Sequence, residues 1–221
     1  SLTAADLDGD QDIDLVSLGG IPWVLRNHGN GTFAAPQLPA GFFQGVRNLA
    51  DLDGDQDLDL ATAHGSSDSP ILSVSLNQGD GTFAAPVPYI AGIAAEWVRT
   101  ADLDGDHDPD LVLASVEGYV SVLHNQGAGT FVDPLTYRVD RIWRSSQNVA
   151  LGGDETPDLF FVDDQNQNPG GLSVLKNQGD GTFQAPIVID VGIAPTFATT
   201  ADLDGDNDLD LAVSHRQANA I

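Results

Sequence analysis

Short apolar runs alternate with polar stretches along the whole chain. The runs are four to six residues long and rich in Val, Leu and Phe, as in DLVSL, DLATA, DLVLA, DLFFV and DLAVS. Gly, Asn and Asp separate them, and no window shows a sustained apolar period of about 3.6 residues over the length of a helix. Runs of this length and composition, bounded by turn-forming residues, predict β-strands throughout.

Two polar motifs recur along the chain and divide it into repeats. The first, DLDGDxDxD, starts at Asp6, Asp51, Asp102 and Asp202, and an eroded copy, VALGGDETPDLFFV, occupies 149–162. The second, NxGxGTF, starts at Asn27, Asn77, Asn125 and Asn177. Together they define one repeat domain with repeats at approximately 1–45, 46–96, 97–144 and 145–196 and a half repeat at 197–221. A period of this length indicates blades or solenoid turns.

Each repeat is interpreted as four strands. One run leads into the Asp-rich loop, a second leaves it, a third meets the Gly-rich turn, and a fourth begins at the Thr-Phe pair of that turn. The glycines supply the positive φ that a tight hairpin needs. Four antiparallel strands in a repeat of this size predict an all-β fold, namely a β-propeller built from four-stranded blades.

These motifs resemble the FG-GAP and VCBS repeats of integrin alpha-subunit-like β-propellers. DLDGDxDxD is similar to the family's Asp-rich loop, and GTFAAP, GTFVDP and GTFQAP are similar to its Phe-Gly to Gly-Ala-Pro segment. The likeness covers essentially the whole chain. Because four and a half repeats are visible, we expect part of a larger propeller or one completed by another chain, with self-association through the unfinished blade as one outcome.

The aspartates at every second position of one tight loop require a cation. Unit charges about 4–5 Å apart repel by roughly 1 kcal/mol in bulk water and by several times that near a protein surface. Carboxylate oxygens without His or Cys suit a hard ion, and Ca²⁺ accepts about six to eight oxygens, whereas Mg²⁺ retains its waters. The predicted metal residues are Asp6, Asp8, Asp10, Asp12, Asp14, Asp51, Asp53, Asp55, Asp57, Asp59, Asp102, Asp104, Asp106, Asp108, Asp110, Asp202, Asp204, Asp206, Asp208 and Asp210.

The loop differs from an EF-hand, because its glycine is at position 4 rather than 6, position 12 carries no Glu, and strands flank it. The resemblance to integrin-type loops implies that the side chains at positions 1, 3, 5 and 9 bind calcium, together with the backbone carbonyl at position 7. The side chains at position 7 would then be free to vary. The leucines at position 2 are expected to point into the blade; they are Leu7, Leu52, Leu103 and Leu203.

The eroded copy at 150–158 has Ala150 and Gly152 at positions 1 and 3, and of the five aspartates it keeps only Asp154 and Asp158. We therefore expect about four Ca²⁺ sites and none at this copy. The alternative is a set of Asp-rich surface loops that bind no metal. If calcium binds, its role is structural, with the weak affinity of extracellular modules, roughly 10⁻⁴ to 10⁻³ M.

The composition excludes several classes of partner and reaction. The formal net charge is −25 with Lys176 as the sole lysine, so neither nucleic acid nor an anionic membrane surface is an expected partner. There is no cysteine, and no apolar run is long enough for direct membrane insertion. The histidines show no ligand spacing and no nucleophile, metalloprotease or phosphate-binding motif occurs, so no catalytic residue is predicted.

The loops opposite the Asp-rich loops vary from repeat to repeat, and variable loops on a rigid scaffold commonly carry binding sites. All three tryptophans, Trp23, Trp97 and Trp143, lie at or beside them, and YRVDRIWRSS adds Arg141 and Arg144 just before the eroded copy. We predict partner binding at these residues. Structural roles stay open and are favoured: the aromatic rings fill gaps between blades, and the arginines neutralise nearby acid where one calcium is missing.

The sequence therefore predicts an extracellular or cell-surface, calcium-stabilised binding module for a glycan or a cell-surface protein, in adhesion or lectin-like recognition. Two other classes remain open. One is the propeller portion of a polysaccharide lyase or another carbohydrate-active enzyme, and the other is a structural subunit of a surface assembly or filament.

Overall fold

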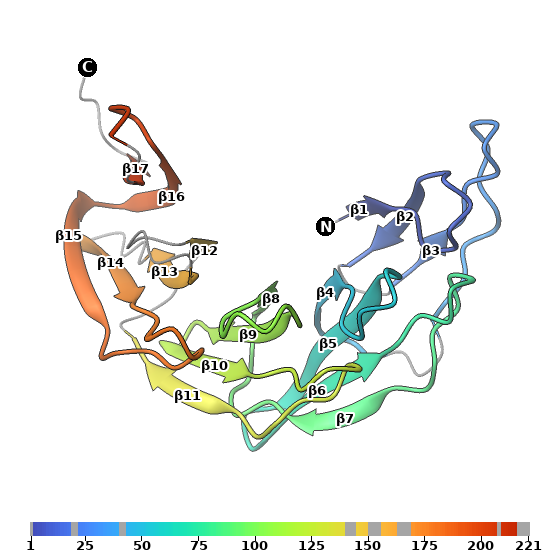
Figure 1. The fold of residues 1–221 in the computed structure, drawn as a ribbon, viewed down its shortest axis with the longest axis horizontal. Coiled ribbons are helices and arrows are strands. Elements are labelled where there is room, and N and C mark those ends of the chain that lie inside the picture. Colours follow the sequence, from blue (N-terminus) through green and yellow to red (C-terminus); the bar gives the residue numbers. More distant parts are fainter. Residues whose placement is uncertain are drawn as a thin grey trace. The chain divides into compact units, whose positions relative to one another are not determined.

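The computed structural model describes residues 2–18, 22–39, 43–139, 145–149, 156–162, 169–206 and 209–215. Within these ranges the regular secondary structure consists of strands, with no helix (Figure 1). The all-β prediction is therefore confirmed. The strands form several small antiparallel sheets in which the order of the strands follows the chain.

The sheets follow the sequence repeats. The first contains β1 (Leu2–Ala5), β2 (Asp14–Ser17) and β3 (Val24–Leu25). The second contains β4 (Val46–Ala50), β5 (Asp59–Ser66), β6 (Ser69–Ser75) and β7 (Val87–Ile90). The third contains β8 (Trp97–Ala101), β9 (Asp110–Ser115), β10 (Tyr119–Leu123) and β11 (Leu135–Arg138). The fourth contains β12 (Ser145–Val149), β13 (Asp158–Val162), β14 (Pro169–Leu175) and β15 (Ile187–Ile193), and the fifth β16 (Pro195–Ala201) and β17 (Asp210–His215).

The second strands of the third and fourth repeats are the most deeply buried. Every residue of β9 and β13 is buried, whereas β7 and β11 on the outer edge are largely exposed. This explains why the second strands appear in the sequence as continuous apolar runs instead of alternating with polar residues. A strand at the edge of a sheet can contain polar residues because it has a neighbouring strand on one side only and is exposed to water.

The fourth strand starts later than the sequence predicted. The Phe of the GTF turn pairs with the Asn that opens the turn in an isolated bridge, as in Asn77↔Phe83, and β7 begins only at Val87. A proline stands just before this strand start, at Pro86, and it has no N–H to donate to a ladder. In the first repeat the fourth strand is reduced to a single bridge, Val24↔Gln37.

Contacts divide the chain into two compact units. One comprises Ser1–Thr100, Asp108–Ala114 and Ser121–Leu135, and the other comprises Ala101–His107, Ser115–Val120 and Thr136–Ile221. A core cluster of the first unit joins two consecutive repeats; it consists of Leu7, Val16, Val24, Leu60 and Phe83. A cluster of the second unit does the same for the fourth and fifth repeats; it consists of Phe160, Val162, Leu172, Val174 and Ala198. Within each unit, a repeat therefore completes its core with its neighbour.

Candidate metal centre

The aspartate at position 1 organises the backbone of each loop. In the second repeat, Asp51 accepts hydrogen bonds from the amides of Gly54 (2.8 Å) and Gln56 (3.0 Å). The first loop repeats this pattern at Asp6, and the third at Asp102. These bonds curl the chain around the carboxylates.

Two residues of each of the first three loops have left-handed backbone. Position 4 is glycine, as expected, with φ of +81° at Gly54. Position 6 is also left-handed, although it is not glycine: φ is +72° at Gln11, +77° at Gln56 and +74° at His107. This region disfavours side chains that carry a Cβ. Sequence reasoning missed position 6, because nothing in Gln or His marks it as left-handed.

The carboxylates of positions 1, 3 and 5 converge in three loops. Ligand oxygens within 4.8 Å of one another are offered by Asp6–Asp8–Asp10, Asp102–Asp104–Asp106 and Asp202–Asp204–Asp206. In the second loop the converging set is Asp51, Asp53 and Asp59, which are positions 1, 3 and 9. Among the described residues, position 7 joins none of these sets. Asp208 lies outside the described residues.

Position 9 has a role that the sequence did not reveal. Asp59 is fully buried and accepts the amide of Leu52 (2.8 Å) on one oxygen and the amide of Asn77 (2.7 Å) on the other. Asn77 opens the NxGxGTF turn, so one carboxylate joins the Asp-rich loop to the end of the third strand. Burial raises the pKa of Asp59 to about 6, because a buried anion lacks solvation.

The hydrogen bond from the turn asparagine to the aspartate at position 9 recurs in the other repeats that contain an NxGxGTF turn. The amides of Asn27, Asn125 and Asn177 donate to Asp14, Asp110 and Asp158 at 2.7–2.8 Å. Asp158 belongs to the eroded copy and is 1% exposed. Asp158 makes this bond although positions 1 and 3 of its loop carry no carboxylate, so the bond does not depend on those two carboxylates.

The same asparagines also connect consecutive repeats. The side-chain amides of Asn77, Asn125 and Asn177 donate to the carbonyls of Leu7, Leu52 and Leu103, at 2.8–2.9 Å. Each acceptor is the leucine at position 2 of the preceding repeat's Asp-rich loop. Each of these side-chain amides also donates to a carbonyl of its own repeat, at Leu58, Pro109 or Pro157, so one buried group bonds both repeats.

The position-2 leucines are buried wherever such a turn follows. Leu7, Leu52 and Leu103 are at most 1% exposed, as predicted. For Leu203 the prediction was wrong, because its side chain is 65% exposed. The three buried leucines each have the turn of the next repeat at their carbonyl, whereas no described residue plays that part for Leu203.

The side chain at position 7 faces the turn of its own repeat. A Cβ placed on Gly79 would lie 3.0 Å from Oδ2 of Asp57, and one on Gly29 would lie 2.2 Å from Oδ2 of Asp12. Both glycines also have positive φ. The first glycine of the NxGxGTF turn is therefore needed for two reasons: its backbone has positive φ, and the position-7 side chain of the Asp-rich loop lies too close to leave room for a Cβ.

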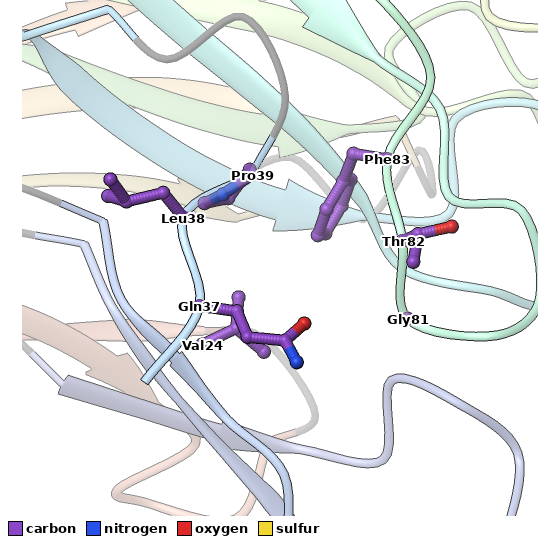
Figure 2. A pocket seen from close by; sticks show the side chains of 7 residues that line it. All are labelled: Val24, Gln37, Leu38, Pro39, Gly81, Thr82 and Phe83. Atoms are coloured by element: carbon purple, nitrogen blue, oxygen red, sulfur yellow. The ribbon is translucent and has the colours of Figure 1, made fainter. Parts of the chain in front are cut away.

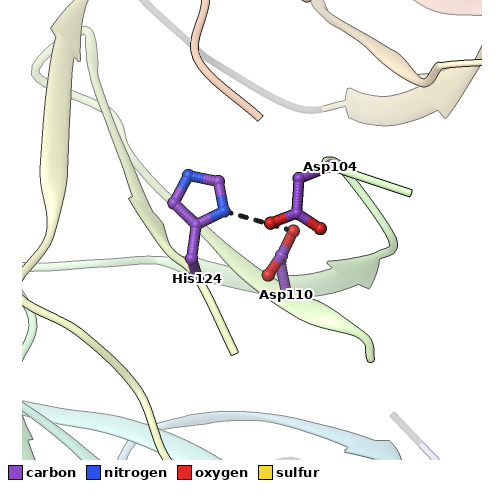
Figure 3. Close-up of side chains that lie close together, drawn as sticks. All are labelled: Asp104, Asp110 and His124. Carbon is purple, nitrogen blue, oxygen red and sulfur yellow. Dashed lines mark ion pairs between the residues drawn. The ribbon is translucent and has the colours of Figure 1, made fainter. Parts of the chain in front are cut away.

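Basic groups stand beside two of the loops. Arg26 pairs with Asp8 at 3.1 Å, and Nδ1 of His124 lies 3.4 Å from the fully buried Asp110 (Figure 3). Both basic residues directly precede the turn asparagine of their repeat, where the second repeat has Leu76. The environment of the loops therefore differs from repeat to repeat even though the aspartates are the same.

The residues present fit a calcium ion. Burial raises the pKa of Asp8, and the negative charges of Asp14 and Asp10 raise it further, although Arg26 acts in the opposite direction. Burial likewise raises the pKa of Asp53, and the charge of Asp55 adds to the increase. One oxygen of Asp8 is buried without a hydrogen bond. Carboxylates whose ionised form is disfavoured in this way gain from a nearby cation, and an all-oxygen donor set suits a hard one.

The predicted partner-binding residues are only partly described. The side chain of Trp23 is 37% exposed, and Trp97 is half-buried at the start of β8. Arg141, Trp143 and Arg144 lie outside the described residues, so that patch stays a prediction.

Two tyrosines on the fourth strands β7 and β11 fill junctions between consecutive repeats. Tyr89 packs edge-on against Phe131, and Tyr137 packs in the same way against Phe183, each with ring centroids 5.5 Å apart. These two tyrosines therefore contribute to packing between repeats.

A model of the FG-GAP-like repeat matches the sequence four times, at residues 6–62, 51–113, 102–152 and 151–213. The chain belongs to the FG-GAP-like repeat family. The resemblance inferred from the two motifs is thus confirmed. The FG-GAP-like match at 151–213 begins inside the eroded copy, so the repeat tolerates the loss of the first loop carboxylates.

Solved structures with a similar fold include the V. cholerae biofilm matrix protein Bap1, with 20% sequence identity and a TM-score of 0.56 over 91% of this chain. The chain also matches the NanB sialidase from Streptococcus pneumoniae, with 11% identity and a TM-score of 0.49 over 91% of this chain. The chain spans 30% of the Bap1 chain and 32% of the NanB chain, about a third of each. No curated protein sequence matches it. In the described part of the chain, no helix has the length and apolar character needed to cross a membrane.

Proposed function

We propose that the chain is a calcium-stabilised β-propeller module in which each sheet is a blade and each complete Asp-rich loop binds one Ca²⁺. The observation that carries the calcium proposal is the convergence of three carboxylates within 4.8 Å in four separate loops. Mutual repulsion would open such loops unless a cation offsets it. The likeness to Bap1 in fold and the family membership support the propeller arrangement.

The aspartates at positions 1, 3, 5 and 9, with the carbonyl at position 7, would hold the ion. Calcium supplies positive charge at the centre of the loop. The chain supplies the remaining order, because position 1 curls the loop and position 9 ties it to the turn. Such a site is closed by the protein's own ligands, so its role is structural rather than catalytic.

We further propose that the module acts outside the cell or at its surface, as a binding platform for a glycan or a surface protein. Loops of this kind belong to the weak-affinity class of calcium sites, which fill only at extracellular calcium levels. Bap1, which shares the fold, is a biofilm matrix protein, and this is compatible with such a setting. The exposed Trp23 offers one aromatic surface for stacking.

Calcium titration by isothermal calorimetry, with thermal unfolding in calcium and in chelator, tests the metal. We expect about four weak sites and a midpoint of unfolding that falls in chelator. An unchanged midpoint would remove the calcium proposal. A glycan and surface-protein binding screen, run with calcium and again with chelator, tests the platform separately, and consumption of a glycan with release of unsaturated ends would replace it with the lyase alternative.

A further inference from the structure

A tyrosine fills the same place at two junctions between repeats. Tyr89, on the fourth strand of the second repeat, packs edge-on against Phe131 and donates its hydroxyl to the Gly129 carbonyl at 3.2 Å. Tyr137, one repeat later, packs on Phe183, and its hydroxyl accepts the Phe183 amide at 3.2 Å. The NxGxGTF turn of the following repeat thus offers an aromatic face, a carbonyl and an amide to a phenol ring.

The first repeat has no tyrosine at this place. The bridge Val24↔Gln37 corresponds to the pair Val74↔Val87 of the second repeat, so Pro39 occupies the position of Tyr89. Proline has neither the aromatic ring nor the hydroxyl group of tyrosine. The junction between the first two repeats is therefore built like the next one but lacks the side chain that fills it.

A cavity lies where that ring would be. Its volume is about 190 Å³, and it is lined by Val24, Gln37, Leu38, Pro39, Gly81, Thr82 and Phe83. Figure 2 shows the Phe83 ring directed toward the space in front of Pro39 and Leu38. Sites for drug-sized ligands measure roughly 300–1,000 Å³, so this cavity suits a single ring.

The cavity lining also contains the equivalents of the polar groups that form hydrogen bonds with Tyr89 and Tyr137. Gly81 and Phe83 stand in the NxGxGTF turn where Gly129 and Phe183 stand in theirs. Their carbonyl and amide are thus the counterparts of the groups that bond Tyr89 and Tyr137. Phe83 is only 5% exposed, so its ring is held in place by the core.

We propose that this cavity binds a tyrosine side chain presented by an extended segment of a partner protein. The chain itself shows the complementary group twice, because both native occupants are tyrosines and Tyr89 comes from an extended strand. The proposal rests on the binding role proposed above but not on calcium. A phenylalanine would keep the ring contact and lose the hydrogen bond of the hydroxyl.

The test is a ¹H–¹⁵N NMR titration of the full chain in calcium with N-acetyl-tyrosinamide and, separately, N-acetyl-phenylalaninamide. We expect saturable shifts centred on the amides of Gly81, Thr82 and Phe83, with millimolar affinity. The phenylalanine probe should bind about 2- to 10-fold more weakly, the range for one neutral hydrogen bond. Equal affinity for both probes, absence of saturable shifts, or shifts centred elsewhere would overturn the proposal.

Three variants locate the binding. Pro39→Tyr supplies the missing ring from within the chain and should weaken the tyrosine probe at least about tenfold. Pro39→Ala leaves the cavity open and should retain binding. Ile189→Tyr is the matched control, since it adds a tyrosine at the same position of the fourth repeat, which contributes no residue to the lining of the cavity. Thermal unfolding shows that each variant is folded, and full binding by folded Pro39→Tyr would contradict the proposal. A failed titration beside an intact calcium response would leave the metal proposal standing.

Discussion

The second and fourth repeats contain equivalent hairpin loops that differ in how many of the five aspartates they have. Residues 51–59 have aspartate at all five odd positions, whereas 150–158 keep it only at Asp154 and Asp158. Asp59 and Asp158 nevertheless make the same bond to the amide of the turn asparagine, at 2.7 Å in both repeats. The motif therefore has two separable parts: a buried carboxylate that ties strands together, and a group of carboxylates suited to a cation.

The largest expected effect follows from removing the tying carboxylate. Asp59→Ala leaves the amides of Leu52 and Asn77 without their acceptor, and Asp158→Ala does the same for Asn177. Each buried unsatisfied amide costs about 1–3 kcal/mol, so Asp59→Ala should lower the free energy of unfolding by about 2–5 kcal/mol. Urea unfolding in chelator measures it. If Asp158→Ala proved harmless, the division of the motif into two parts would be wrong.

The next effect separates the metal part. In 10 mM calcium, a site with a dissociation constant of about 1 mM stabilises the fold by about 1.4 kcal/mol. Asp53→Asn should remove that increment and one calcium from the calorimetric stoichiometry. Asp154→Asn, in the eroded copy, is the matched control and should change neither. A calcium response lost in both variants would place a site at the eroded copy.

Removing the asparagine side chains that connect consecutive repeats should lower the free energy of unfolding by different amounts. Asn125→Ala and Asn177→Ala each remove a buried hydrogen bond to a carbonyl of the preceding repeat, at Leu52 and Leu103, and should lower the free energy of unfolding by about 0.5–1.5 kcal/mol. Asn27→Ala should cost less, since the hydrogen bonds of its side chain, to the Ile13 carbonyl and from the Gly29 amide, stay within its own repeat and are exposed. Chelator should not change this order. Equal losses at all three positions would show that the link between repeats contributes nothing extra.

The smallest effect tests the backbone of the metal loop. Gln56 has φ of +77°, where a side chain with a Cβ costs about 1–2 kcal/mol and glycine costs little. After the entropy that glycine adds to the unfolded chain, Gln56→Gly should stabilise by about 0.5 kcal/mol. Thermal unfolding with and without calcium checks it. A destabilised variant would mean that contacts of the Gln56 side chain outweigh the strain.

Much of the fold was accessible from local patterns. The apolar runs and the Gly-rich turns predicted strands because both signals lie within a few residues of one another. The start of the fourth strand was mispredicted: Phe83 looked like the first residue of a strand, but it closes the turn by bridging Asn77. A bridge and a strand start have the same residue preferences, so the sequence does not distinguish them.

The candidate site was accessible only in part. The spacing of the aspartates indicated a cation loop, which stays a prediction, and the structure brings Asp51 and Asp53 together. Nothing in the spacing separated Asp59 from its neighbours, because its special status comes from burial and from the amide of Asn77, eighteen positions away. The exposure of Leu203 was missed for the same reason, since burial depends on what the next repeat places over it.

The sequence by itself determined the family, the all-β character, and the place of each Asp-rich loop and Gly-rich turn. These follow from short-range signals that four near-copies make unmistakable. Only the tertiary structure decided that position 9 is a strand tie, that Asn77 reaches the carbonyl of Leu7 seventy positions earlier, and that Pro39 leaves a cavity where Tyr89 fills the next junction. Such features depend on contacts between consecutive repeats, and local residue preferences carry no record of which distant groups meet.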